Sequence, residues 1–238
     1  MEPLIIFENV VKRFNSNRVL DDISLEIRKG EVFGIIGRSG CGKSTLLKVL
    51  IGAYRVNSGR IIYDGKDVTN RPDKIKDFAG ITTQENSFYD KLTVYENLKY
   101  YANLNNVRLG RARLNEILDS VGLLKSRNKI AGDMSGGMKR RLDFSISLVH
   151  NPKLLILDEP TTGLDPLLVK QFWKVVENVR KEGKTIIVIS HLFSELEDSC
   201  DRIGIMDKGR IARIIPIKEK KSDLYKEFIE VVGEGGAR

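Results

Sequence analysis

A glycine-rich segment ends in a lysine and a serine with the spacing of a phosphate-binding loop. Residues 37–45 read G-R-S-G-C-G-K-S-T and fit the pattern G-x-x-x-x-G-K-[ST]. Glycines let the backbone wrap with its N–H groups pointing inward, and a helix that starts inside the turn adds its positive N-terminal end. We therefore expect Lys43 to reach the β- and γ-phosphates of a nucleotide and the Ser44 hydroxyl to bind Mg²⁺. The phosphate-binding residues predicted from this motif are Gly37, Ser39, Gly40, Cys41, Gly42, Lys43, Ser44 and Thr45.

Cys41 lies inside this motif and is open to two interpretations. A thiol beside a helix N-terminus can have a lowered pKa and react with alkylating agents. Alternatively, it is a small residue that fits the loop, and we favour this second interpretation.

Two adjacent carboxylates follow an apolar run later in the chain. Residues 154–157 read L-L-I-L, and Asp158 and Glu159 come directly after them. A strand buried on both faces would deliver Asp158 to the C-terminal edge of a sheet, where ligands of open α/β sheets bind. There Asp158 would hold Mg²⁺, and Glu159 would polarise a water that attacks the γ-phosphate.

The elements that must position these residues alternate between strands and helices. Residues 4–7, 23–27 and 60–63 predict strands near the N-terminus, and the apolar run 31–36 leads into the phosphate loop. Apolar spacing predicts a helix from Ser44 onward, followed by helices at 94–104, 111–121, 138–149 and 167–181 and strands at 154–157 and 185–189. A strand–helix–strand order with short connections predicts an α/β protein with a parallel sheet. From Pro216 the sequence predicts a short helix and a frayed end.

Composition limits the classes of protein that the chain can represent. The chain has 238 residues with 40 Lys and Arg, 32 Asp and Glu, a net charge of +8 and two cysteines. Two cysteines cannot form a disulfide framework, the N-terminus lacks a signal-peptide pattern, and no apolar run approaches the ~18–20 residues of a membrane span. We therefore expect a cytoplasmic chain that does not span a membrane. The two signs of charge are interleaved, so we expect no specific nucleic-acid partner.

Taken together, the motifs resemble one family, the nucleotide-binding subunits of ATP-binding-cassette (ABC) transporters, over about residues 4–213. Residues 134–138 read M-S-G-G-M and resemble the signature sequence of that family, which most phosphate-loop NTPases lack. Met134 and Met138 depart from the commoner leucine and glutamine, and methionine at 138 is typical of the branch that resembles drug and polysaccharide exporters. The resemblance implies a P-loop NTPase fold with a RecA-like parallel sheet, an N-terminal antiparallel β subdomain and an inserted α-helical subdomain. It assigns residues 1–216 to the ATPase domain, with the helical subdomain at about 88–150, and 217–238 to a short tail.

The signature residues Ser135, Gly136 and Gly137 precede a predicted helix, so their hydroxyl and N–H groups form a second anion site. In the family, the phosphate loop of one subunit and the signature of another enclose the same ATP. The resemblance therefore implies a head-to-tail dimer with a second copy or a related cassette subunit.

Other site residues are carried over from the family one position at a time. Gln84 matches the glutamine that contacts Mg²⁺ and the attacking water, and His191 the histidine that touches the γ-phosphate. Asp165 matches a residue of the loop that crosses to the partner subunit. Phe14 matches the aromatic residue that stacks on adenine, for which most members use tyrosine.

The resemblance implies an ATP-hydrolysing subunit that drives a separate membrane subunit at the inner face of the cell membrane, with export favoured. Phe88 and Tyr89 precede a predicted helix, and we expect them to form an exposed patch that receives the membrane subunit. The alternatives are a soluble cassette ATPase of cofactor assembly or a nucleic-acid maintenance ATPase. The second is disfavoured because the segment between Lys43 and Asp158 has no sustained coiled-coil heptads.

Overall fold

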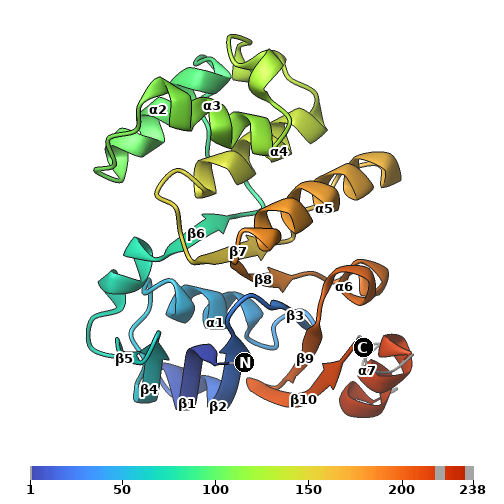
Figure 1. Ribbon diagram of the computed structural model, residues 1–238. Coiled ribbons are helices and arrows are strands. Elements are labelled where there is room, and N and C mark those ends of the chain that lie inside the picture. Colours follow the sequence, from blue (N-terminus) through green and yellow to red (C-terminus); the bar gives the residue numbers. More distant parts are fainter. Residues whose placement is uncertain (1, 218–222, 234–238) are drawn as a thin grey trace. The chain divides into compact units, whose positions relative to one another are not determined.

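The computed structural model describes residues 2–217 and 223–233. The chain divides into two units: unit 1 comprises Met1–Ala79 and Thr185–Arg238, and unit 2 comprises Gly80–Lys184 (Figure 1). Each unit positions its own set of candidate site residues.

The N-terminal part of unit 1 is an antiparallel sheet with the strand order β2-β1-β4-β5. Its strands are β1 (Pro3–Phe14), β2 (Asn17–Arg28), β4 (Ser58–Tyr63) and β5 (Lys66–Asp67). In β2 the side chains of Ile23, Leu25 and Ile27 are buried and alternate with exposed ones, the period expected when one face of a sheet is covered. This sheet is the N-terminal antiparallel β subdomain that the resemblance implied, although β1 and β2 are longer than the predicted strands.

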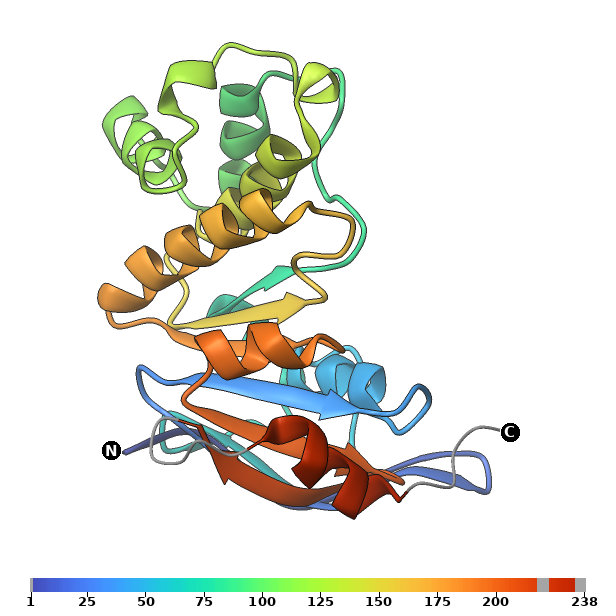
Figure 2. The ribbon, with the colours of Figure 1, turned by 90° about the vertical axis from the view of Figure 1, so that its right-hand side faces the viewer.

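The second group of strands in unit 1 supports the phosphate loop. Strand β3 (Val32–Gly37) runs parallel to both β9 (Arg202–Asp207) and β8 (Thr185–Ile189), and β10 (Arg210–Pro216) is antiparallel to β9 (Figure 2). Residues of β3 and β8 are buried almost without interruption, which explains why their sequences are continuous apolar runs. The parallel sheet is therefore present as predicted, whereas β9 and β10 were not anticipated.

The helices of unit 1 follow strands or lie near the end of the chain. Helix α1 (Lys43–Leu50) begins inside the glycine-rich loop, and η1 (Pro72–Asp77) is a short 3₁₀ helix. Helix α6 (Phe193–Ser199) follows β8, and α7 (Leu224–Val232) packs near it through the ring of Phe193, which meets the rings of Tyr225 and Phe228 edge-on. The short helix predicted after Pro216 is α7, while residues 218–222 and 234–238 of that tail lie outside the described residues.

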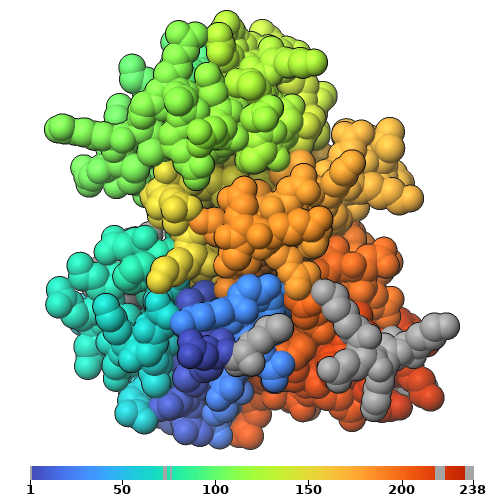
Figure 3. All heavy atoms as spheres, viewed as in Figure 1, coloured from blue at the N-terminus to red at the C-terminus, as the bar shows by residue number. Residues whose placement is uncertain are grey.

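Unit 2 places a helical segment between two neighbouring strands, β6 (Ala79–Thr82) and β7 (Leu154–Asp158). That segment contains α2 (Val94–Leu104), α3 (Arg111–Ser120), η2 (Leu124–Ser126), η3 (Ala131–Asp133) and α4 (Gly136–Ser147), and α5 (Pro166–Lys181) follows β7. Figure 3 shows the surface of the segment between β6 and β7 in green to yellow. The inserted helical part implied by the family resemblance is thus present in the element order.

Local sequence signals explain where the helices of unit 2 begin. Thr93 and Glu96 form a capping box at the start of α2, in which each side chain bonds the other residue's backbone N–H. The core between α4 and α5 includes Phe144 and Phe172, whose ring centroids are 5.6 Å apart in an edge-to-face contact. Among the residues that the structure describes, no helix combines the length and the apolar character needed to cross a bilayer.

Candidate functional site

The phosphate loop of unit 1 has the backbone geometry that its glycines predict. Gly40 has φ +77° and Gly42 has φ +113°, conformations that residues with a Cβ rarely adopt. Gly42 immediately precedes α1, so the N–H groups of the first helical turn begin at Lys43. The Lys43 ammonium donates to the carbonyls of Gly37 and Arg38 at 2.6 and 2.9 Å, which holds it over the loop. Ser44 is exposed on the first turn of α1, and Thr45 is half-buried.

Two of these glycines are also required by close packing. A Cβ on Gly37 would lie 2.3 Å from the carbonyl oxygen of Met206, and one on Gly42 would lie 2.9 Å from that of Val19. A Cβ on Gly40 would meet nothing within 4 Å. The tertiary structure therefore demands glycine at 37 and 42 for steric reasons, and at 40 for its backbone conformation alone.

Burial disfavours the interpretation of Cys41 as a reactive thiol. Its side chain is buried, with 7% exposed, and burial raises the pKa of the thiol although the nearby Lys43 charge opposes the rise. Cys41 is therefore the small residue that fits the loop, and its backbone N–H donates to the Arg38 carbonyl at 3.2 Å.

His191 and the phosphate loop follow neighbouring strands. Ile35 of β3 is paired with Ile189 of β8 in a parallel register, so Gly37 and His191 leave the sheet at the same edge. His191 is exposed there. The structure thus brings together two groups that the sequence predicted to act on one phosphate chain.

Phe14 ends β1 with its ring 39% exposed. The ring contacts Tyr54 edge-on at 5.1 Å, and the Lys12 ammonium lies 4.8 Å from its centroid. Tyr54 and Lys12 thus hold the ring in place, while the residue keeps about two fifths of its surface exposed.

The acidic pair of unit 2 ends β7. Asp158 and Glu159 are both half-buried, and Glu159 has φ +48°, an uncommon left-handed conformation for a residue with a side chain. Gln84 lies in the exposed loop that follows β6, the strand beside β7.

A buried arginine that the sequence analysis missed joins these two loops. Arg140 of α4 donates from Nη1 to the carbonyl of Thr83 at 2.6 Å and from Nη2 to the carbonyl of Glu159 at 3.0 Å. Burial lowers the pKa of its guanidinium, and the negative charges of Asp143 and Asp158 oppose that fall. Asp143, one turn along the helix, is also buried, and burial raises the pKa of its carboxyl. The available signal was an opposite-charge pair, Arg140 and Asp143, at helical spacing in a predicted helix.

The signature residues form an accessible helix N-terminus. Ser135 is the N-cap of α4, but its side chain makes no cap hydrogen bond, and both Ser135 and Gly136 are exposed. Gly137 is buried against Leu168 of α5. An exposed hydroxyl beside the N–H groups of a helix start can bind an anion, and the predicted anion site here stays a prediction.

Asp165 has a structural task within unit 2. Its carboxylate accepts hydrogen bonds from the backbone N–H groups of Leu167 and Leu168 at 3.0 Å each and thereby caps α5. Its predicted contact with a partner subunit stays a prediction.

The expected docking pair divides into a buried and an exposed residue. Phe88 is only 9% exposed, so the expectation that it forms part of an exposed patch is wrong, because its ring belongs to the core of unit 2. Tyr89 is 48% exposed and meets Tyr100 edge-on at 4.9 Å, with their hydroxyls 3.2 Å apart.

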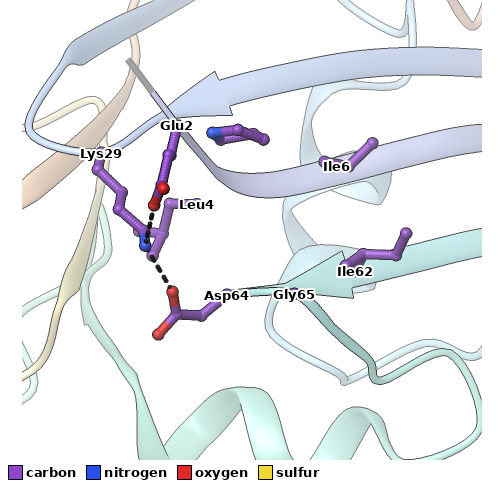
Figure 4. A pocket seen from close by; sticks show the side chains of 8 residues that line it. Glu2, Leu4, Ile6, Lys29, Ile62, Asp64 and Gly65 are labelled. Atoms are coloured by element: carbon purple, nitrogen blue, oxygen red, sulfur yellow. Dashed lines mark hydrogen bonds and ion pairs between the residues drawn. The ribbon is translucent and has the colours of Figure 1, made fainter.

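A cavity of about 280 Å³ in unit 1 contains none of the candidate residues. It lies on the antiparallel sheet, where the Lys29 ammonium is 3.1 Å from Glu2 and 2.9 Å from Asp64 (Figure 4). The charged side chains that line this cavity pair with one another, so the cavity is not counted as part of the site.

Comparison with known proteins places the whole chain beside nucleotide-driven transport proteins. The profile of the family described as "ABC transporter" matches residues 20–162. The lantibiotic transport ATP-binding protein SrtF of Streptococcus pyogenes is 36% identical over 220 residues, which are 92% of this chain and 92% of that protein. The bacitracin transport ATP-binding protein BcrA of Bacillus licheniformis is 34% identical over 231 residues, 96% of this chain and 75% of that protein.

A solved structure of similar fold is the ADP conformation of an ATP-binding cassette of an ABC transporter. It has a TM-score of 0.87 and 26% sequence identity, and the match covers 97% of this chain and 98% of that one. The P-loop NTPase fold that the resemblance implied is therefore confirmed.

Proposed function

Since this chain belongs to the ABC transporter family, we propose that it is the ATP-hydrolysing subunit of a transporter whose membrane-spanning part is a separate chain at the inner face of the membrane. The observation that carries the proposal is the presence of two helix starts suited to phosphate, one in each unit. These are the glycine-rich loop before α1 with Lys43, and the exposed start of α4 with Ser135. Methionine at 138, typical of the exporter branch, favours export.

The donor set fits a magnesium nucleotide. Mg²⁺ prefers oxygen ligands and is usually held by few protein groups together with substrate phosphates. Ser44 and Gln84 are exposed and Asp158 is half-buried at a strand end, and their oxygens are the proposed ligands. When bound, the ion would neutralise charge on the β- and γ-phosphate oxygens.

Hydrolysis is assigned to Lys43, His191 and Glu159 in this proposal. Lys43 binds the β- and γ-phosphates through its ammonium, and His191 binds the γ-phosphate. Glu159 accepts a proton from the water that attacks the γ-phosphorus in line with the departing β-phosphate oxygen. The exposed Phe14 ring stacks on adenine.

The site is completed by a second subunit in this proposal. The start of α4 offers an exposed hydroxyl and free helical N–H groups, which suit the γ-phosphate bound to the loop of another copy or of a related cassette. ATP then acts as part of the interface, and its hydrolysis reopens the dimer.

The test uses Glu159→Gln, which keeps the shape of the side chain and removes the base. We expect hydrolysis to fall by more than about 10²-fold and the variant to elute as a dimer in saturating Mg-ATP, measured by light scattering. Glu177→Gln, an exposed residue of α5, is the matched control and stays monomeric under the same conditions. A monomeric Glu159→Gln, or one with full activity, would contradict the proposal.

A second variant tests the role of the α4 start in that dimer. Gly136 has open space around it, because a Cβ there would meet only a Leu164 carbon at 4.0 Å. Gly136→Asp in the Glu159→Gln background therefore keeps the fold but adds a negative charge at the anion site. We expect it to abolish the ATP-dependent dimer while binding of ATP to the monomer remains.

The docking surface for the membrane subunit is proposed at Tyr89 and its neighbour Tyr100, which are exposed and in mutual contact. Tyr89→Ala should reduce co-purification of the membrane subunit while ATP hydrolysis by the isolated chain stays near normal. The control is Tyr225→Ala, which removes an exposed tyrosine of α7. Equal loss in both variants would contradict this assignment.

A further inference from the structure

Arg140 is a buried arginine whose guanidinium donates hydrogen bonds to main-chain carbonyls of two loops and lies 3.8 Å from the carboxylate of Asp143 on its own helix. Only 6% of the residue is exposed. Nη1 donates to Thr83, Nε donates to Pro160, and Nη2 donates to Glu159 and, at a longer 3.4 Å, to Asp158. The acceptors lie in two loops, one after β6 and one after β7. A buried cation satisfied by backbone carbonyls of two loops fixes the distance between them.

The geometry of these contacts requires an arginine. A guanidinium is a planar fork whose donors point in fixed directions, whereas the ammonium of lysine is a point charge at the end of a flexible stem. Lysine at 140 can reach one carbonyl or another, but it cannot bond Thr83, Glu159 and Pro160 in one plane.

The hydrogen bond from Arg140 to the Glu159 carbonyl affects the direction of the Glu159 side chain. With φ +48°, Glu159 is in a conformation that costs a residue with a Cβ about 1–2 kcal/mol relative to right-handed alternatives. Rotation of Glu159 into a common conformation would turn the two peptide units beside it, whose carbonyls, those of Asp158 and Glu159, both accept hydrogen bonds from Arg140 Nη2. The arginine therefore favours the unusual backbone and, with it, the direction of the carboxylate.

Arg140 also belongs to the helix that carries the signature. Ser135 is the N-cap residue of α4, and Arg140 follows in the second turn of the same helix. Thr83 directly precedes Gln84. A movement of α4 would therefore move the loops that contain Glu159 and Gln84, because the Arg140 side chain is hydrogen-bonded to both.

We propose that Arg140 is a positioning residue for ATP hydrolysis, which sets the orientation of Glu159 and Gln84 relative to the start of α4 through its hydrogen bonds to the carbonyls of Thr83, Glu159 and Pro160. The inference rests on the proposed roles of Glu159 and Gln84 in hydrolysis. It adds a residue that contacts neither nucleotide nor metal.

The test compares Arg140→Lys with Arg141→Lys. Arg141 is the next residue of α4 and also donates to backbone carbonyls, those of Val121 at 3.2 Å and Gly137 at 3.4 Å, but not to the loops of Glu159 and Gln84. Both variants keep the positive charge and lose a guanidinium. A displacement of a catalytic group by about 1 Å lowers the rate by about 10²-fold. We therefore expect Arg140→Lys to lower kcat by roughly 10–100-fold. KM and the Kd for ATP should stay within about 3-fold, and Arg141→Lys should keep kcat within about 2-fold.

The decisive measurement combines Arg140→Lys with Glu159→Gln. If Arg140 acts through Glu159, Arg140→Lys should slow the Glu159→Gln variant by a much smaller factor than it slows the wild type, because one of the two positioned groups is already gone. A merely structural role predicts instead that the two losses multiply, that ATP binding falls with kcat, or that Arg141→Lys is equally impaired. Each of these results would overturn the inference.

Failure of the inference is distinguishable from failure of the proposed function. Full activity in Glu159→Gln alone would refute the base that we assign, whatever Arg140 does. An inactive Glu159→Gln together with a fully active Arg140→Lys would refute only the positioning role.

Discussion

The ion pair between Glu31 and Arg202 joins the residue before β3, the strand that leads into the phosphate loop, to the first residue of β9. Two hydrogen bonds join the side chains: Arg202 Nη2 donates to Glu31 Oε1 at 2.8 Å, and Arg202 Nε donates to Glu31 Oε2 at 3.0 Å. The side chains are 4% exposed for Glu31 and 15% exposed for Arg202. The substitution Arg202→Met leaves the buried carboxylate of Glu31 without the cation that pairs with it.

The cost of that change follows from burial. Breaking a buried pair by removing one partner costs about 3–5 kcal/mol, and we take the lower end because Arg202 is slightly exposed. At about 2–4 °C per kcal/mol for a chain of this length, Arg202→Met should lower Tm by roughly 6–12 °C. Arg60 and Glu8 form a matched control, because their 2.7 Å pair is as short but 64% and 35% exposed. Arg60→Met should cost less than about 1 kcal/mol.

Thermal and urea unfolding of the two single variants measure this difference. Glu31→Gln combined with Arg202→Met should recover part of the loss, since a neutral amide needs no counter-charge. The reasoning is refuted if Arg202→Met destabilises no more than Arg60→Met, or if Glu31→Gln adds its full cost to that of Arg202→Met.

Three further predictions concern the loop, a helix start and the thiols. Gly42→Ala should lower the free energy of unfolding more than Gly40→Ala, which costs about 1–2 kcal/mol of backbone strain, because only the first also places a Cβ 2.9 Å from a carbonyl oxygen; equal losses in urea unfolding would contradict this. The pKa of Glu96 is lowered because the Thr93 backbone N–H and hydroxyl donate to its carboxylate, so its stabilisation is present above the unfolded pKa and is lost as pH falls through the folded pKa. The stability difference between wild type and Glu96→Gln should therefore shrink below about pH 4, and a constant difference across pH would refute the assignment. Cys41 is buried with a raised pKa, so a thiol reagent at neutral pH should label it slowly in the folded chain and rapidly in denaturant; fast labelling of folded protein would show the burial to be wrong.

Much of the fold could be predicted where the signal lies within a few successive residues. Helix α2 has the predicted bounds, because a capping box starts it and apolar spacing continues through Leu104. Strand β8 also has its predicted bounds, because its buried faces leave a run of apolar residues between polar ones.

Other elements escaped prediction because neighbours in space stabilise them. Strand β1 continues through polar residues past Phe7, with irregular register against β2 that breaks the alternating pattern. Strand β9 contains Gly204, a residue that weakens a strand signal, and a Cβ there would lie 3.1 Å from the Phe33 ring.

The sequence by itself determined the phosphate loop, the acidic pair and the helix start at Ser135, since each depends on the backbone of consecutive residues and on the chemistry of side chains within one motif. Only the tertiary structure decided that Phe88 is buried, that Asp165 caps a helix and that Arg140 holds two loops. The physical reason is that burial and hydrogen-bond partners are supplied by segments far apart in the chain, and a local pattern carries no record of which segments meet.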